Sequence, residues 1–296
     1  FMSLWLEMLQ VARLAPKVLG DASDLVQNFL TNQQNSDGGF QDREGKSDLY
    51  YTVFGLDALS VFQAEPDLDA VEKFLRTFGE GEELDLVHLS CLTRCWGSLG
   101  VERMPKSLRK SLLRRLEDYR KPCGGWDNNH DRDHGTAYGS FLALGAYQDM
   151  GKLPPKPLRI LQSLKKLETP DHAWNNHPNL PIGSTNPTAG AVVLLNNLHL
   201  PINAEVGQWL RARLHAQGGF VAVPDAPIPD LLSTATALHA LAALDVRLTE
   251  KETESCLDFI DSLWDATGGF HGHWSDDYID CEYTFYGLLA LGHLSL

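Results

Sequence analysis

The amino-acid sequence predicts an all-α protein in which six helical hairpins form one closed ring, as a single domain over residues 1–296. Glycine pairs followed by an aromatic residue recur at 38–40, 124–126, 218–220 and 268–270. Helical patterns with one apolar stripe lie before these pairs, and helical patterns that are apolar nearly all round follow them. A single hairpin of this kind cannot bury its apolar face, so the copies must stack, and a closed ring leaves no exposed ends.

The first 20 residues predict an N-terminal amphipathic helix that precedes the ring. Their sequence begins FMSLWLEMLQVARL, which carries Glu7 within its apolar stretch and no small-residue cleavage site. It therefore lacks the features of a signal peptide. No apolar run reaches about 18 residues, so we expect no membrane span.

Two wide gaps between the glycine pairs predict further, degenerate copies of the repeat. Segments 85–99 and 184–198 fill these gaps and complete a set of six. The six inner helices are expected to start near Asp48, Asp85, Arg132, Ser184, Asp230 and Asp280. Aspartate or serine opens five of the six, because a side-chain oxygen at this position accepts a hydrogen bond from an unpaired backbone N–H.

The striped helices between these starts are expected to form an outer layer around the inner helices. They include 23–34, 110–120, 158–168 and 252–264. A helix that is apolar all round is buried, and a striped helix covers it. The glycine pairs are expected to end the outer helices, since glycine accepts the left-handed backbone of a C-cap.

Composition excludes several classes of function. The net charge of −14 repels phosphate backbones, so we expect no nucleic-acid partner. The five cysteines are an odd number without the regular spacing of a disulfide framework. This usage favours a reducing cytoplasm.

Two pairs of stretches resemble the repeats of the α/α toroid superfamily. They are QNSDGGF with DLYYTVFGLDAL, and GGFHGHW with DCEYTFYGLLAL. This superfamily includes the β subunits of protein prenyltransferases and the squalene and hopene cyclases. The resemblance covers roughly residues 20–296, and it implies an α/α toroid with inner and outer rings of helices around a central cavity. These residues mainly build the ring, so they specify activity less than fold.

The stretch GGFQDREGKSDLYYT resembles a prenyltransferase β-subunit repeat in which Arg and Lys hold the prenyl diphosphate and Asp and Cys bind zinc. The resemblance implies that Arg43 and Lys46 bind a prenyl diphosphate. It also implies that Asp48 and His88, the latter in an Asp-x-x-His context, bind a divalent metal, zinc or magnesium. Tyr50 stands where the family has its zinc-binding cysteine, so we expect zinc to be held weakly.

Polar clusters at two other helix starts supply candidate catalytic residues. WDNNHDRDHGT (126–136) contains Asp133 and His134, and HGHWSDDYIDCE (271–282) contains Asp280. Such groups could move protons or bind a divalent ion. Polar loop tips and N-caps explain the same residues without a catalytic role.

Aromatic residues crowd the predicted starts of the inner helices. We expect substrate contacts from Tyr50, Tyr51, Tyr138 and Tyr283 in a central funnel. Such a funnel suits an isoprenoid lipid, because aromatic faces stabilise carbocations and ligand pockets are mostly apolar. Aromatic residues are also common in ordinary helical cores.

Three functions remain open at this point. The first is a prenyltransferase-like transferase that binds a prenyl diphosphate. The resemblance implies a helical protein partner for such a subunit. The second is a terpene-cyclase-like enzyme that uses an aspartic acid, for which the resemblance implies a second toroid. The third is a non-catalytic toroid that binds a lipid or a protein partner.

Overall fold

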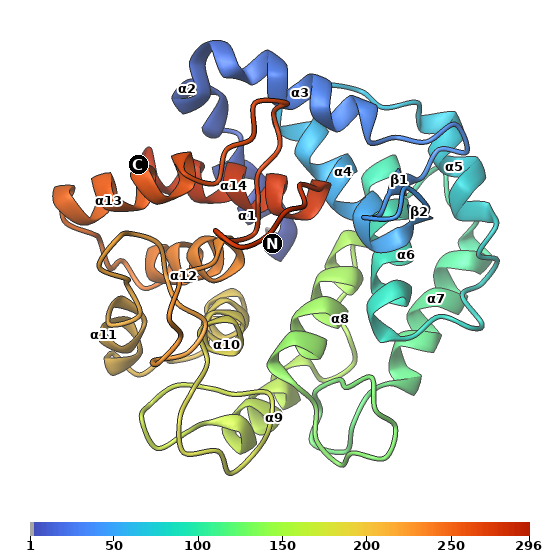
Figure 1. The fold of residues 1–296 in the computed structure, drawn as a ribbon. Helices are drawn as coiled ribbons and strands as arrows, with labels where there is room; N and C mark the ends of the chain where they lie inside the picture. The colour runs from blue at the N-terminus through green and yellow to red at the C-terminus, as the bar shows by residue number, and fades with distance from the viewer. Residues whose placement is uncertain (1–2) are drawn as a thin grey trace.

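The computed structural model describes residues 3–296, and it is a closed ring of helices (Figure 1). Within these residues the only two-stranded sheet is a short hairpin of β1 (Phe40–Gln41) and β2 (Ser47–Asp48). Six inner helices form the barrel: α4 (Leu49–Val61), α6 (Leu86–Leu99), α8 (Ala137–Asp149), α10 (Thr185–Asn197), α12 (Leu231–Ala243) and α14 (Cys281–Leu294). Each packs on the next, and α14 closes the ring against α4.

An outer helix precedes each inner one, which confirms the predicted α/α toroid. The outer helices are α3 (Ser23–Asn32), α5 (Leu68–Arg76), α7 (Lys106–Asp118), α9 (Ile160–Leu167), α11 (Glu205–Arg211) and α13 (Glu250–Asp261). Two 3-10 turns, η1 (Gly20–Ala22) and η2 (Pro157–Arg159), lead into α3 and α9.

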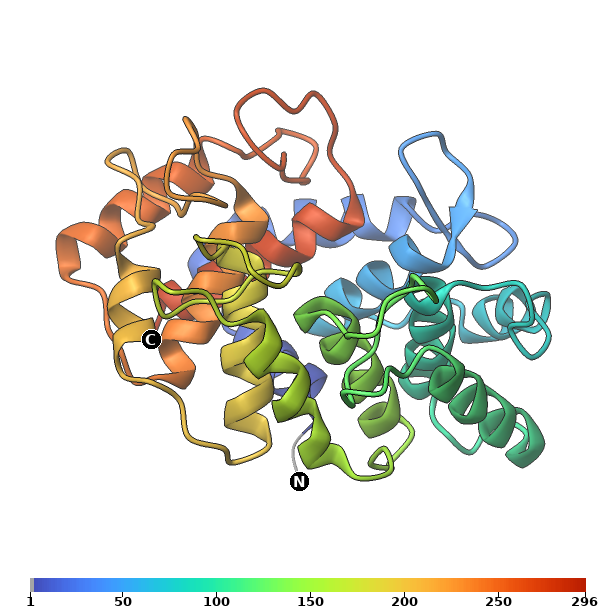
Figure 2. The ribbon, with the colours of Figure 1, turned by 90° about the horizontal axis from the view of Figure 1, so that it is seen from below.

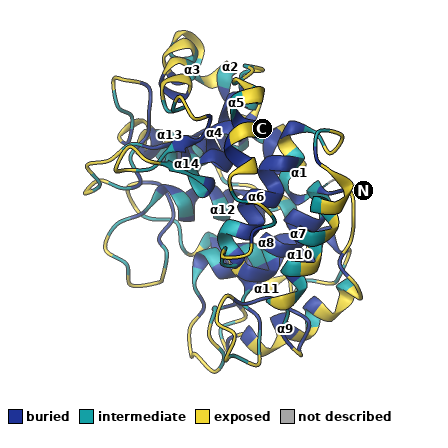
Figure 3. Ribbon diagram, turned by 90° about the vertical axis from the view of Figure 1, so that its right-hand side faces the viewer, coloured by how far each residue is buried: buried dark blue, intermediate teal, exposed yellow. Residues whose placement is uncertain are grey.

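Burial separates the two layers as the apolar patterns predict (Figure 3). Helix α5 buries one stripe, made of Val71, Phe74 and Leu75. Helix α4 buries residues on nearly all sides, including its one charged residue, Asp57. The inner helices therefore form the core of the protein, and the outer helices shield it from water.

The glycine pairs join neighbouring hairpins rather than end helices. Helix α3 ends at Asn32, and Gly38 follows six residues later with φ +98°. A Cβ on Gly38 would lie 2.1 Å from the carbonyl carbon of Ala70 in α5, and one on Gly268 would lie 2.3 Å from the carbonyl oxygen of Leu25 in α3. The first glycine of the pair is required because the backbone of the next outer helix approaches too closely for a side chain.

Five of the six predicted inner-helix starts are correct, and the third is wrong. Helix α8 begins at Ala137, and its N-cap is Thr136 rather than Arg132. The Thr136 hydroxyl accepts a hydrogen bond from the Gly139 N–H. Arg132 instead forms an ion pair with Asp127 in the preceding loop, at 3.1 Å. The loop is therefore longer than the motif suggests.

The predicted N-terminal helix is two helices, α1 (Leu4–Ala12) and α2 (Ala15–Leu19), with Pro16 in the first turn of α2. Helix α1 packs against α4, α8, α10 and α14 and so closes one end of the barrel. The N-terminus lies at the end opposite the long loops (Figure 2). No helix in the described residues is long and apolar enough to cross a membrane.

Candidate functional site in the central cavity and at its mouth

All six inner helices start at the same end of the ring, which we call the mouth (Figure 2). Loops of neighbouring repeats meet there. The backbone N–H of Leu86 donates to the Asn128 side chain, and the N–H of Leu231 donates to the carbonyl oxygen of Gly272. The opposite end, closed by α1, is called the floor. The predicted site residues at the starts of the inner helices consequently share the mouth.

Arg43, the first predicted diphosphate contact, is held by two carboxylates of the last repeat. Its Nε lies 2.9 Å from Asp280 Oδ2, and its Nη2 lies 3.0 Å from Asp276 Oδ2. The guanidinium carbon also lies 5.2 Å from the ring centre of Tyr278 and 5.5 Å from that of Tyr283. Arg43 therefore ties the first hairpin to the last, and its charge is neutralised locally.

Lys46, the second predicted diphosphate contact, points into solvent at the tip of the β1–β2 hairpin. Its Nζ lies 2.7 Å from Glu44 Oε2, and both side chains are about three-quarters exposed. Arg43 and Lys46 thus have different carboxylate partners. The structure does not bring the two cations together around one anion site.

His88 lies between two carboxylates, as a metal ligand would, but its imidazole is protonated, and a histidine that binds a metal must be neutral. Its Nδ1 lies 2.8 Å from Asp85 Oδ1, and its Nε2 lies 3.7 Å from Asp48 Oδ2. The contacts to Asp48 and Asp85 outweigh burial and raise the pKa of His88 to about 9. An imidazolium has no lone pair to give to a metal.

These residues therefore fit an ion pair rather than a metal site. Asp48 also caps α4, since its Oδ1 accepts the Tyr50 N–H at 2.8 Å. No group of three or more His, Cys, Asp or Glu side chains is arranged to hold a metal anywhere in residues 3–296. Zinc or magnesium binding at Asp48 and His88 remains a prediction that this geometry does not favour.

Tyr50, which stands at the position of the family's zinc-binding cysteine, interacts with a carboxyl group of the last repeat. Its hydroxyl donates a hydrogen bond to Glu282 Oε1 at 2.6 Å. Burial, more than the nearby Asp280, raises the pKa of Glu282 to about 7, although the Tyr50 hydrogen bond and Arg43 oppose this rise. Burial likewise raises the pKa of Tyr50. The pair places a carboxyl group that still carries a proton near neutral pH beside the cavity.

The central cavity has a volume of about 220 Å³ and mostly apolar walls. Tyr50, Tyr138, Phe141 and Tyr286 supply its aromatic faces, and Met8 of α1 contributes to its lining. The volume is below the roughly 300–1,000 Å³ typical of ligand pockets. Two predicted substrate contacts, Tyr50 and Tyr138, thus line the cavity.

The other two predicted tyrosines belong to the rim of the mouth. Tyr283 lies against Arg43, and burial raises its pKa to about 12. Tyr51 also lies close enough to Arg43 and Asp280 for their charges to act on its hydroxyl. Asp280 is the N-cap of α14, where its Oδ1 accepts the Tyr283 N–H at 2.9 Å. Its second oxygen binds Arg43, so its carboxylate has two structural partners already.

Asp133 and His134, the other predicted catalytic residues, lie away from this cavity. Asp133 is 80% exposed and forms a 3.7 Å ion pair with Lys166. His134 Nδ1 contacts the carbonyl oxygen of Gly135. Both residues line an outer depression beside α9. The structure therefore does not bring them together with Asp280.

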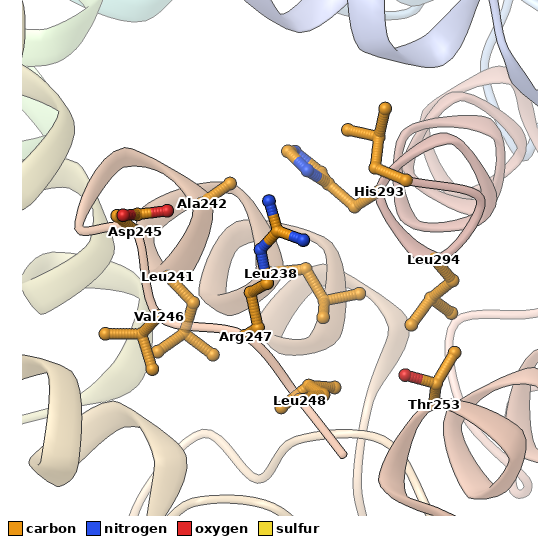
Figure 4. Close-up of a pocket in the computed structure, with 11 residues that line it drawn as sticks. Leu238, Leu241, Ala242, Asp245, Val246, Arg247, Leu248, Thr253, His293 and Leu294 are labelled. Carbon is orange, nitrogen blue, oxygen red and sulfur yellow. The ribbon is translucent and has the colours of Figure 1, made fainter. Parts of the chain in front are cut away.

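Sequence reasoning missed a pair of buried histidines at the far end of the cavity. His239 Nδ1 lies 3.0 Å from His293 Nε2. His239 lines the central cavity, whereas His293 lines a separate groove of about 440 Å³ beside Leu238, Leu241 and Arg247 (Figure 4). Burial lowers the pKa of His239 to about 4 and that of His293 to about 3, so both imidazoles are neutral.

A buried charge cluster lies near the floor. Arg94 is 3.6 Å from Asp57 and 3.6 Å from Asp149, and its guanidinium carbon lies 4.1 Å from the ring centre of Trp5 in α1. Burial raises the pKa of Asp149 to about 6 and that of Asp57 as well, and Arg94 opposes both shifts. These residues join α1, α4, α6 and α8, which indicates a structural role.

Comparison with known proteins identifies the family. A model of the prenyltransferase alpha-alpha toroid domain matches residues 3–92 and 188–295. These segments make up more than half of the chain, so the chain belongs to the prenyltransferase alpha-alpha toroid family. None of the curated proteins matches it in sequence.

Solved structures with the same fold carry different activities in their names. The type II terpene cyclase MstE from Scytonema has a TM-score of 0.62 at 12% identity, covering 94% of this chain and 98% of its own. A glycosidase has a TM-score of 0.56 at 11% identity, covering 97% of both chains. Protein geranylgeranyltransferase-I from Candida albicans, complexed with GGPP, has a TM-score of 0.51 at 15% identity, covering 98% of this chain and 82% of its own. At such low identity these likenesses establish the fold alone.

Proposed function

We propose that the protein binds an uncharged isoprenoid in its central cavity and protonates it from Glu282, as an acid-initiated, terpene-cyclase-like enzyme. The hydrogen bond between Tyr50 and Glu282 at an aromatic cavity carries this proposal. The acid is a glutamic acid, whereas the sequence suggested an aspartic acid. Because the Tyr50 hydroxyl donates to Oε1, the proton of the acid is free to sit on Oε2.

The reaction begins with transfer of this proton to one carbon of an isoprenoid double bond. The π electrons form the new C–H bond, and the other carbon becomes a cation. The faces of Tyr138, Phe141 and Tyr286 stabilise that cation, because aromatic rings carry negative charge on their faces. Loss of a proton from a neighbouring carbon restores a double bond. His239 is a neutral base in the cavity wall that can take it.

A raised pKa serves this role by keeping the acid protonated near the operating pH. A general acid works best when its pKa is close to that pH. Glu282, with a pKa of about 7, meets this condition. Asp280 does not serve as well, because its carboxylate is committed to Arg43 and to the α14 N-cap.

Prenyl diphosphate transfer has less support at this mouth. A diphosphate leaving group needs fixed cations or a metal to stabilise its developing charge. Arg43 and Lys46 are each paired with carboxylates. His88 is also paired, with Asp48 and Asp85, and as an imidazolium it cannot bind a metal. The type II terpene cyclase from Scytonema aligns over 98% of its length with this single toroid. That cyclase therefore has a single toroid, so the second toroid that the resemblance implied is not required for a protein described as a terpene cyclase.

A deuterium experiment tests the proposal. The purified protein is incubated in D₂O with uncharged isoprenoids of increasing length, and products are analysed by mass spectrometry. We expect a product that contains one deuterium on carbon. Glu282→Gln should lower its rate by about 10²-fold or more, in line with the loss of a general acid. Glu44→Gln removes a solvent-exposed carboxylate of the mouth and should leave the rate unchanged.

Absence of labelled product across the whole series would overturn the proposal and leave a non-catalytic lipid-binding toroid. Equal rates for wild type and Glu282→Gln would show that another group supplies the proton.

A further inference from the structure

A second chamber adjoins the central cavity at the mouth. It has a volume of about 400 Å³ and lies between the starts of α6 and α8 and the loops around 127–132 and 176–177. Tyr138 and Asn176 line both this chamber and the central cavity. The two volumes therefore meet at these side chains, with an apolar part inside the ring and a polar part at its mouth.

The polar chamber has no unbalanced charge among its buried walls. Its one arginine, Arg132, pairs with Asp127 at 3.1 Å, and Asp127 is only 3% exposed. Lys121 lies behind the wall and donates to the carbonyl oxygen of Asn129 at 2.7 Å. The amide side chains of Asn128, Asn129 and Asn176 also line the chamber, beside apolar residues such as Leu86 and Leu142. Walls of this kind favour an uncharged polar group over a diphosphate.

Asn176, which lines both the chamber and the central cavity, carries a polar atom without a hydrogen-bond partner. The side-chain oxygen of Asn176 is buried and has no hydrogen-bond partner in the protein. The backbone N–H of Asn176 is fixed by the Asn175 side chain at 2.8 Å. Asn175 in turn donates to the Ser184 hydroxyl at 2.9 Å, which anchors the segment to the start of α10. A buried acceptor without a partner is unfavourable, and a ligand that donates a hydrogen bond relieves it.

We propose that the polar chamber holds a hydroxyl-bearing head group that donates a hydrogen bond to Asn176, while the isoprenoid tail fills the central cavity. This inference rests on the proposed function and names its substrate class, an isoprenoid alcohol or glycoside. A hydroxyl both donates and accepts, so it satisfies the Asn176 amide in either orientation of its oxygen and nitrogen. A diphosphate offers acceptors only, so in the assigned orientation of the Asn176 amide it would leave the buried oxygen without a donor.

Binding of matched ligands tests this assignment without requiring turnover. Isothermal titration calorimetry compares farnesol, its methyl ether, farnesyl β-glucoside and farnesyl diphosphate. Farnesol and its ether differ in the hydroxyl proton, so only farnesol can donate. We expect farnesol to bind about tenfold more tightly than the ether. Binding of the glucoside at least as tightly as farnesol identifies a glycoside, and weaker glucoside binding identifies the free alcohol.

Two variants assign the effect to Asn176. Asn176→Leu should weaken farnesol about tenfold and leave the ether unchanged. Asn176→Asp keeps an acceptor oxygen, so it should retain the preference for farnesol and weaken the diphosphate further. Asn32→Leu makes the same change at an exposed position at the end of α3 and serves as the control. Thermal melting checks that each variant is folded.

Three results would overturn the inference: equal binding of farnesol and its ether, tightest binding of the diphosphate, or no binding of any ligand. Failure of the proposed function is a separate result. If farnesol binds through Asn176 but the deuterium experiment yields no labelled product, the head-group site stands and the acid chemistry falls.

Discussion

The mouth and the floor of the toroid hold their charges in opposite ways. At the mouth, Arg43 and His88 are partly exposed, and each has two carboxylate partners. At the floor, Arg94 is buried and lies 3.6 Å from each of its two aspartates, and the rings of His239 and His293 contact each other. Mouth charges can rearrange at small cost when a ligand arrives. Floor charges are part of the fold, because water cannot replace a lost partner.

The largest effect is expected from Arg94→Met at the floor. Removing Arg94 leaves Asp57 and Asp149 buried without a cation, which should lower the free energy of unfolding by about 3–5 kcal/mol at pH 7. The loss should be smaller at pH 5, because the pKa of Asp149 is about 6 and its carboxyl is then largely protonated. Urea denaturation at the two pH values measures this.

A matched variant separates this effect from loss of side-chain packing. Arg103→Met removes a solvent-exposed arginine that pairs with Asp69, so it should change the free energy of unfolding far less. Adding Asp57→Asn and Asp149→Asn to Arg94→Met should recover much of the lost stability. If Arg94→Met, Arg103→Met and the variant with both aspartates also replaced were equally stable, the stability of the floor would not depend on this charge cluster.

The next largest effect concerns the buried histidines. The unfolded chain takes up protons below a pH of about 6.5, whereas folded His239 and His293 stay neutral down to pKa values of about 4 and about 3. The free energy of unfolding should therefore fall as the pH decreases through this window. Each histidine contributes up to about 1.4 kcal/mol per pH unit. His293→Leu should make the slope shallower, and His177→Leu, at an exposed position, should not.

The smallest effect is expected from His88 at the mouth. Its contribution to stability changes with pH in the opposite direction to that of the buried histidines. The folded pKa of about 9 lies above the unfolded value, so protonated His88 stabilises the protein fully below a pH of about 6.5. This contribution is lost as the pH rises through 9. Because the ring is 40% exposed, His88→Gln should cost only about 0.2–1 kcal/mol at pH 6. A difference between wild type and variant that persists at pH 10 would contradict this origin.

The fold was readable from sequence because it depends on local repeats. The glycine pairs, the N-cap aspartates and the two kinds of apolar pattern each act within one hairpin or between neighbours. The start of α8 was misplaced, since Thr136 caps this helix and Arg132 pairs with Asp127 in the loop before it. Ring closure follows from the same repeats, and Gly268 packs on α3 in the way that Gly38 packs on α5.

The site was only partly readable because its key contacts join distant segments. The sequence placed Tyr50 and Tyr138 in the cavity, as aromatic residues at inner-helix starts. It could not reveal that Arg43 would meet Asp280, because these residues lie at opposite ends of the chain and become neighbours only when the ring closes. Glu282 stood in a noticed acidic cluster, yet its role depends on burial and on Tyr50.

The most direct test of the account is the titration of Glu282. Carbon-13 NMR of labelled glutamate carboxyls between pH 4 and 9 should show one group with a pKa near 7 that is missing in Glu282→Gln. Tyr50→Phe should move this pKa upward, because the Tyr50 hydrogen bond lowers it. If the carboxyl that disappears in Glu282→Gln titrates near the ordinary value of 4.5, the acid is ionised at neutral pH. The proposed proton donor would then be wrong.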